Sequence, residues 1–179
     1  DGERMLPARH VLIDQGKIIN ANYMGKISAE MRVVDGKDRT LLPGLIDAHV
    51  HAYQDQDLPL LFGVTSHIDM FSAVDLMQGI KKRMAEGKNK TAPDLFSAGT
   101  LATAPNGHGT EYGMTIETLE KPEQAQAWVD KRIAEGSDFI KIVMEHGGAA
   151  HTFNSLYVAT VQALIKASHA RKKLAVVHI

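Results

Sequence analysis

The stretch Leu42-Pro43-Gly44-Leu45-Ile46-Asp47-Ala48-His49-Val50-His51 determines how the rest of the sequence is interpreted. It has the pattern of a turn followed by a strand that carries two histidines two residues apart. Side chains alternate between the faces of a strand, so His49 and His51 are predicted to point the same way. Two imidazoles on one face at the end of a strand are suited to bind a metal together. The alternative is a pair of structural histidines.

Composition limits the chemistry that the protein can use. The 179 residues are 44% hydrophobic and 23% charged, with a formal net charge of -1, which is ordinary for a globular protein. We therefore expect no nucleic-acid partner, because there is no basic patch. We also expect no membrane partner, because no apolar run approaches the roughly 20 residues of a membrane span. There are no cysteines and nine histidines, so a transition metal must be held by histidine, a carboxylate or a modified side chain.

Two regions with different patterns are predicted. Residues 1–42 are interpreted as part of a small β-sandwich domain, with strands at 11–13 and 17–19 around a turn at 14–16 and a further strand at 32–34. From residue 43 onward, strands alternate with helices, which is typical of a parallel sheet with crossover helices. The strands are expected at 45–50, 64–69, 94–98, 138–144 and 173–178, and the helices at 72–87, 122–135 and 156–171. Five such units fit an open doubly wound sheet or part of a (β/α)8 barrel.

Two more polar side chains are predicted on the side of the sheet that carries the histidine pair. Lys141 lies on the strand face opposite Ile140 and Ile142, which are expected to pack against helices. A buried lysine is costly to desolvate, and burial lowers its pKa toward that of a neutral, reactive amine. His178 ends the last strand, and parallel α/β folds place their sites at the carboxyl ends of strands. The alternatives are a salt-bridged core lysine and a terminal histidine without a role.

Residues 43–51 resemble the first-strand signature of the amidohydrolase superfamily. Other stretches resemble its imidazolonepropionase-like and Xaa-Pro or Xaa-Arg dipeptidase-like branch, and their order and spacing agree from about residue 10 to the end. These stretches are Gly63-Val64-Thr65-Ser66 with Asp69, Ser97-Ala98-Gly99, Gly107-His108-Gly109, Asp138-Phe139-Ile140-Lys141 and Val176-Val177-His178. The resemblance implies an α/β fold of the (β/α)8 TIM-barrel type. Residues 43–179 would form the N-terminal portion of that catalytic barrel, with about five β/α units.

The resemblance also implies a site for two divalent metal ions, with zinc as the expected metal. His49 and His51 would bind one ion and His178 the other. Lys141 would carry CO2 as a carbamate that bridges both ions. The implied reaction is hydrolysis of a C–N bond in an amide, a cyclic amide or a dipeptide by a metal-bridging hydroxide. The substrate would be a small molecule, and the full-length form is expected to be a homo-oligomer.

A fifth residue, His108, is predicted to be catalytic. It lies in a glycine-flanked loop after the third strand, where it could hydrogen-bond the substrate carbonyl or oxyanion. The alternative is a loop histidine that faces solvent. We interpret His146 and His151 as loop residues and His67 as a core residue. Ile68 stands where relatives often have arginine, so the role of the second strand is left open.

The resemblance leaves part of the site outside the sequence. The family completes its metal centre with a histidine on the sixth strand and an aspartate on the eighth, and both positions would follow Ile179. We therefore expect this sequence to be a fragment of a longer protein, and the fragment alone to be inactive. Localisation stays open between the cytoplasm and, if a signal peptide has been lost, the periplasm or secretion.

Two other functions remain as alternatives. One is a mononuclear deaminase of the same superfamily, which the lysine on the fourth strand disfavours because a single metal needs no bridge. The other is a non-catalytic protein of this fold, similar to the collapsin-response-mediator relatives. Those relatives lose metal ligands, whereas this sequence keeps every ligand that it could supply.

Overall fold

The structure is a computed structural model that describes residues 5–179. The chain divides into two compact units, Asp1–Leu42 and Pro43–Ile179. No helix among the described residues is both long enough and apolar enough to cross a membrane.

The first unit contains one antiparallel hairpin, formed by β1 (Leu12–Asp14) and β2 (Lys17–Asn20). Gln15 and Gly16 connect the strands with φ angles of +48° and +74°, which suit a two-residue hairpin turn. The sequence predicts this hairpin correctly. The predicted strand at 32–34 is wrong, because in the described part of the unit those residues pair with no strand. A single hairpin gives no support for a β-sandwich, which stays a prediction.

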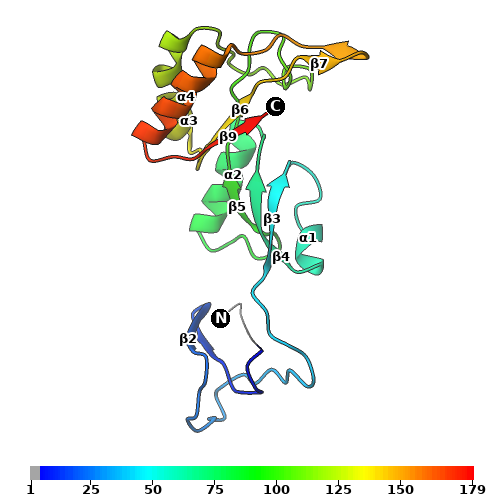
Figure 1. Ribbon diagram of the computed structural model, residues 1–179. Coiled ribbons are helices and arrows are strands. Elements are labelled where there is room, and N and C mark those ends of the chain that lie inside the picture. Colours follow the sequence, from blue (N-terminus) through cyan, green and yellow to red (C-terminus); the bar gives the residue numbers. More distant parts are fainter. Residues whose placement is uncertain (1–4) are drawn as a thin grey trace. The chain divides into compact units, whose positions relative to one another are not determined.

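The second unit alternates parallel strands with helices, as Figure 1 shows. Its parallel strands are β3 (Leu45–Val50), β4 (Val64–Asp69), β5 (Asp94–Ser97), β6 (Ile140–Val143) and β9 (Ala175–His178). Its long helices are α2 (Val74–Ala85), α3 (Ala125–Glu135) and α4 (Val158–Ala170). Four short elements complete it, namely α1 (Leu58–Leu61), η1 (Pro122–Gln124), β7 (Gly147–Gly148) and β8 (His151–Thr152). Every parallel strand falls inside a predicted range, so the α/β class is confirmed.

The parallel strands form two sheets, β3-β4-β5 and β6-β9, joined by a short bridge. Ala102, which follows β5, pairs with Ile142 of β6. The Ala102 N–H donates to the Lys141 carbonyl at 2.8 Å, and the Val143 N–H donates to the Ala102 carbonyl at 2.9 Å. Neighbouring strands therefore follow chain order, as successive strands of a barrel do. No closed barrel forms among the described residues, so the TIM barrel stays a prediction.

Helices α3 and α4 cover one face of the β6-β9 sheet. Ile140 and Ile142 are buried in the same cluster as Trp128 and Val129 of α3 and Leu164 of α4. Side chains alternate along a strand, so the residue between the two isoleucines turns to the opposite face. The fold thus places the side chain at position 141 away from the helices.

Candidate metal centre

The first predicted ligands, His49 and His51, lie at the carboxyl end of β3. The pairing register of β3 with β4 shifts between Asp47 and Val50, so three residue steps on β3 match two on β4. Irregularities of this kind bend a strand and re-aim its side chains, often beside active sites. The two imidazole rings lie 6.1 Å apart with an interplanar angle of 69°. His51 Nδ1 lies 3.5 Å from the carbonyl oxygen of Phe71, which leaves its Nε2 free for a ligand.

A buried carboxylate fixes the backbone directly after His51. Asp69, at the end of β4, is fully buried. It accepts a hydrogen bond from the N–H of Ala52 at 3.0 Å and from the hydroxyls of Ser72 and Ser97. These donors come from the segments that follow β3 and β4 and from β5, so one side chain ties three strand ends together. Asp69 is therefore a positioning residue for the histidine pair.

Lys141 is buried in β6, with 4% of its surface exposed. It forms no ion pair with any of the residues 5–179. Burial lowers the pKa of its amine below the usual range, because the charged form loses its hydration. Within residues 5–179, the alternative of a salt-bridged core lysine therefore finds no support. An uncharged amine in this position is available for covalent chemistry.

The electrostatics of His49 show which groups lie near it. Burial lowers the pKa of His49, the charges of Lys141, His51 and His178 lower it further, and the charge of Asp47 opposes them. These groups come from β3, β6 and β9, with His51 directly after β3 and His178 at the carboxyl end of β9. The structure thus brings Lys141, His51 and His178 within electrostatic reach of His49. A lowered pKa keeps the imidazole neutral, which metal coordination requires. Metal binding by these residues stays a prediction.

His108, the predicted catalytic residue, lies beside the end of β9. Its ring centre is 5.4 Å from that of His178, 5.0 Å from Phe153 and 5.9 Å from Tyr112. Its Nδ1 lies 2.7 Å from a Glu111 carboxylate oxygen, although the two atoms are not aligned as a hydrogen bond. Burial raises the pKa of Glu111, but backbone N–H groups and His108 outweigh it, so the pKa is lowered. With 23% of its side chain exposed, His108 is not the solvent-facing histidine of the alternative interpretation.

Sequence reasoning missed Glu145, which follows β6 immediately after Met144. Its Oε2 lies 3.0 Å from Nε2 of His178 and 3.9 Å from Nε2 of His108. One ligand atom from each of these three residues falls within 4.8 Å of the others. The signal that could have found Glu145 is its position at the carboxyl end of a predicted strand that already carries Lys141. Carboxylates at such ends commonly face the site of a parallel α/β fold.

The structure agrees with the interpretation of His67 as a core residue and of His146 as a loop residue, whereas His151 lies in the short strand β8. His67 is 5% exposed and lines a cavity of about 10 Å³ together with Ile80 and Leu95, so it is a core residue. His146 and His151 belong to the short β7–β8 region, where His151 stacks near Phe153 with ring centres 4.3 Å apart.

One surface depression is lined by none of the predicted site residues. It has a volume of about 470 Å³ and is lined by the start of α2, by Thr100 and by residues 114–116. None of its lining residues is histidine, lysine or glutamate. The predicted metal ligands are therefore grouped outside this depression.

Among known proteins, this chain is similar to solved structures by its fold. No protein-family model and no curated protein matches the sequence. A solved amidohydrolase matches 94% of this chain over 50% of its own length, with a TM-score of 0.73 and 19% identity. A prolidase complexed with N-methylphosphonate-L-proline matches 97% of this chain over 52% of its own, with a TM-score of 0.72 and 22% identity.

The chain has the fold of the amidohydrolases. A Xaa-Pro dipeptidase with bound methionine in the active site is also similar, over 76% of this chain and 43% of its own, with a TM-score of 0.62 and 22% identity. The resemblance to amidohydrolases and Xaa-Pro dipeptidase-like proteins is thereby confirmed at the level of fold. The chain spans about half the length of the solved structures that it matches.

Proposed function

We propose that this chain belongs to a metal-dependent amidohydrolase that hydrolyses a C–N bond in an amide, a cyclic amide or a dipeptide. The observation that carries the proposal is that His51, Lys141 and His178, from three parallel strands or their ends, all lie within electrostatic reach of His49. The fold supports it, because the solved structures of this fold include amidohydrolases and prolidases. A purely structural cluster would not need an unpaired buried lysine among three histidines.

The donor set fits two divalent ions. His49 and His51 would hold one ion and His178 the other, while Lys141, carrying CO2 as a carbamate, would bridge them. Imidazole nitrogens and carbamate oxygens suit zinc. The lowered pKa of Lys141 favours the uncharged amine that reacts with CO2. When bound, the ions would lower the pKa of a water molecule and polarise the substrate carbonyl.

The other residues of the site would position the substrate and the ligands. Asp69 holds the backbone after His51 at the end of β3 through the N–H of Ala52. His108 brings another imidazole to the end of β9, where it can contact the substrate carbonyl or a metal. The site is open to a small molecule at this edge, since the side chains of His108 and His178 are 23% and 38% exposed.

Dipeptides that end in proline are the first substrates to assay, because one similar structure is a prolidase complexed with a phosphonate-proline compound. A homo-oligomeric full-length form also stays part of the proposal. The dipeptide substrate and the homo-oligomer are proposals about the whole protein, because this chain covers 52% of the similar prolidase.

Metal analysis of a lysine variant tests the proposal. We expect the protein incubated with Zn²⁺ and bicarbonate to hold two zinc ions per chain, and Lys141→Met to lose at least one of them. In the complete protein that contains this chain, Lys141→Met should also abolish hydrolysis of Xaa-Pro dipeptides. Lys166→Met is the matched control, because Lys166 is exposed on α4. Absence of bound divalent metal, or full activity of Lys141→Met, would contradict the proposal.

A further inference from the structure

We propose that Glu145 is a metal ligand, and that together with His108 and His178 it holds one divalent cation. The inference rests on the proposed function for one residue, His178, which is already assigned to the second ion. It adds Glu145 and His108 to the ligand set of that ion. It also gives His108 a role on the metal in place of a hydrogen bond to the substrate.

The distances between the three ligand atoms fit a shared ion. Zinc bonds of about 2.0–2.2 Å place two ligand atoms of a tetrahedral site about 3.3 Å apart. Glu145 Oε2 lies 3.0 Å from His178 Nε2 and 3.9 Å from His108 Nε2, and all three ligand atoms fall within 4.8 Å. Binding would therefore require shifts of about 1 Å or less, which side-chain rotation can supply.

Glu145 lacks the partners that a structural carboxylate normally has. Its Oε2 is buried, and within residues 5–179 it receives no aligned hydrogen bond. Within 4.0 Å of its carboxylate, the basic side chains in that part of the chain are the imidazoles of His108 and His178, with no lysine or arginine. A buried carboxylate oxygen without a donor is unfavourable. A cation between Glu145 and the two imidazoles would remove that cost.

The surroundings of His108 match those of a metal-bound histidine. Histidines that bind metal through one ring nitrogen usually present the other to a carboxylate or a carbonyl, which fixes the tautomer. Nδ1 of His108 lies 2.7 Å from a Glu111 oxygen, within hydrogen-bond distance although the two are not aligned, while Nε2 is the atom that faces Glu145. Glu111 also adds a second negative charge beside His108, which favours a divalent cation at this place.

The three residues come from separate elements that the fold brings to one edge. His108 belongs to the loop after β5, Glu145 follows β6, and His178 ends β9. The backbone of β6 and β9 sets this approach, because Val143 pairs with His178 in the parallel register. The side chains are 23%, 30% and 38% exposed, so an ion can enter from solvent.

Titration with Zn²⁺ tests the inference. The metal-stripped chain is titrated in a calorimeter with bicarbonate present, so that Lys141 can form the carbamate, and Co²⁺ absorption spectra report the coordination. The variants are Glu145→Gln, Glu145→Asp and the double variant His49→Asn/His51→Asn, with Glu123→Gln as control, since Glu123 is an exposed glutamate. We expect Glu145→Gln to weaken one site by about 100-fold or more, because outer-shell changes alone cost 10–100-fold. Glu123→Gln should bind as the wild type does, and circular dichroism confirms that each variant is folded.

Each outcome separates this inference from the proposed function. If the double histidine variant keeps a site that depends on Glu145, the inference holds. If that site is the one ion bound by the wild type, and the histidine pair binds none, the inference holds and the two-metal proposal fails. If Glu145→Gln and Glu145→Asp retain both ions with unchanged Co²⁺ spectra, Glu145 only hydrogen-bonds His178 or contacts substrate. The inference is then overturned, and the two-metal proposal stands. Absence of any Zn²⁺ binding overturns both.

Discussion

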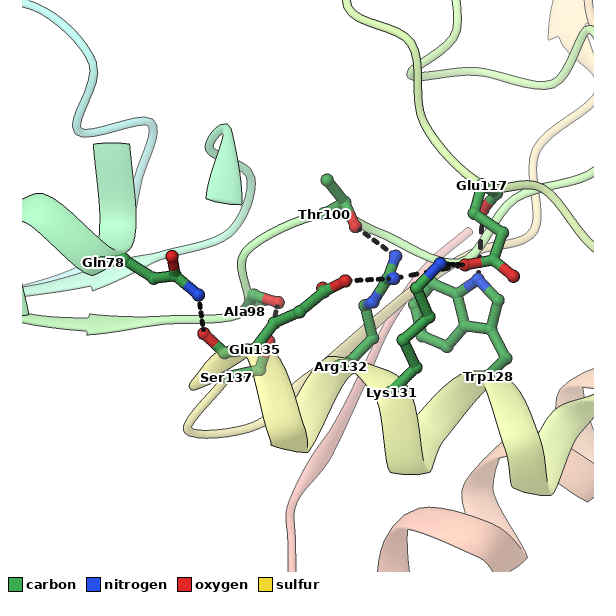
Figure 2. Close-up of polar contacts among 9 residues, drawn as sticks. All are labelled: Gln78, Ala98, Thr100, Glu117, Trp128, Lys131, Arg132, Glu135 and Ser137. Carbon is green, nitrogen blue, oxygen red and sulfur yellow. Dashed lines mark hydrogen bonds and ion pairs between the residues drawn. The ribbon is translucent and has the colours of Figure 1, made fainter. Parts of the chain in front are cut away.

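Two buried cations, Arg132 on α3 and Lys141 on β6, have opposite surroundings. Their exposed fractions are almost equal, 3% and 4%. Figure 2 shows the partners of Arg132. Its guanidinium donates hydrogen bonds to Thr100 at 2.7 Å, to Glu135 at 2.8 Å and to Glu117 at 3.2 Å. It also lies 4.9 Å from the ring centre of Trp128. Only the Nε of Arg132 has no partner among the described residues.

Lys141 has no such complement, since residues 5–179 offer it no ion pair. The two cations therefore differ in how the cost of burying them is offset. The partners of Arg132 offset its desolvation, so its charge can connect α3 to the loops at residues 100 and 117. The cost of burying Lys141 is met instead by a lowered pKa of the amine. A buried ionisable group with partners, such as Arg132, indicates a role in stability. One without them, such as Lys141, indicates a candidate functional residue.

The largest expected effect is on the satisfied cation. Arg132→Met should lower the free energy of unfolding by about 3 kcal/mol, because it leaves Glu135 and Glu117 without their buried partner. The value is at the low end for buried pairs, since these carboxylates are 22% and 45% exposed. Urea unfolding followed by circular dichroism measures it. Lys131→Met is the control, because Lys131 is 55% exposed beside the same Glu117, and its loss should cost under about 1 kcal/mol. Equal losses in the two variants would show that burial of Arg132 matters little.

A buried anion extends the comparison to the opposite charge. Asp69 accepts hydrogen bonds from three donors and is fully buried, so we place it with Arg132 and not with Lys141. Asp69→Asn replaces one acceptor oxygen by a donor amide, and we expect a loss of about 2 kcal/mol in unfolding free energy. Asp75→Asn, at an exposed position on α2, should change it by under about 0.5 kcal/mol. A stable Asp69→Asn variant would mean that the three strand ends are held by packing alone.

The sequence predicts those parts of the site that depend on local pattern. Alternation along a strand suffices to place Lys141 opposite Ile140 and Ile142, and the structure agrees. The same reasoning fails for Val33 and Val34, which are 63% and 78% exposed, because an apolar pair becomes a strand only where a partner strand exists.

Features that join distant segments are beyond such reasoning. The role of Glu145 depends on the pairing of β6 with β9, which brings His178 to it. Likewise, the importance of Asp69 depends on Ser97, which reaches it from the neighbouring strand β5. The residue spacing within one segment does not predict these contacts, because they depend on how two parallel strands are aligned with each other.

The smallest expected effect is on the unsatisfied cation, and it is the most discriminating. In buffer free of metal and bicarbonate, Lys141→Met should leave the free energy of unfolding within about 1 kcal/mol of wild type. Methionine keeps most of the volume and removes an amine that has no ion-pair partner in residues 5–179. Urea unfolding run beside Arg132→Met makes the comparison direct. A loss as large as that of Arg132→Met would show that Lys141 holds the fold together. An unchanged stability combined with loss of zinc would assign the burial of Lys141 to the metal centre, because a residue that contributes nothing to folding has no other reason to carry that desolvation cost.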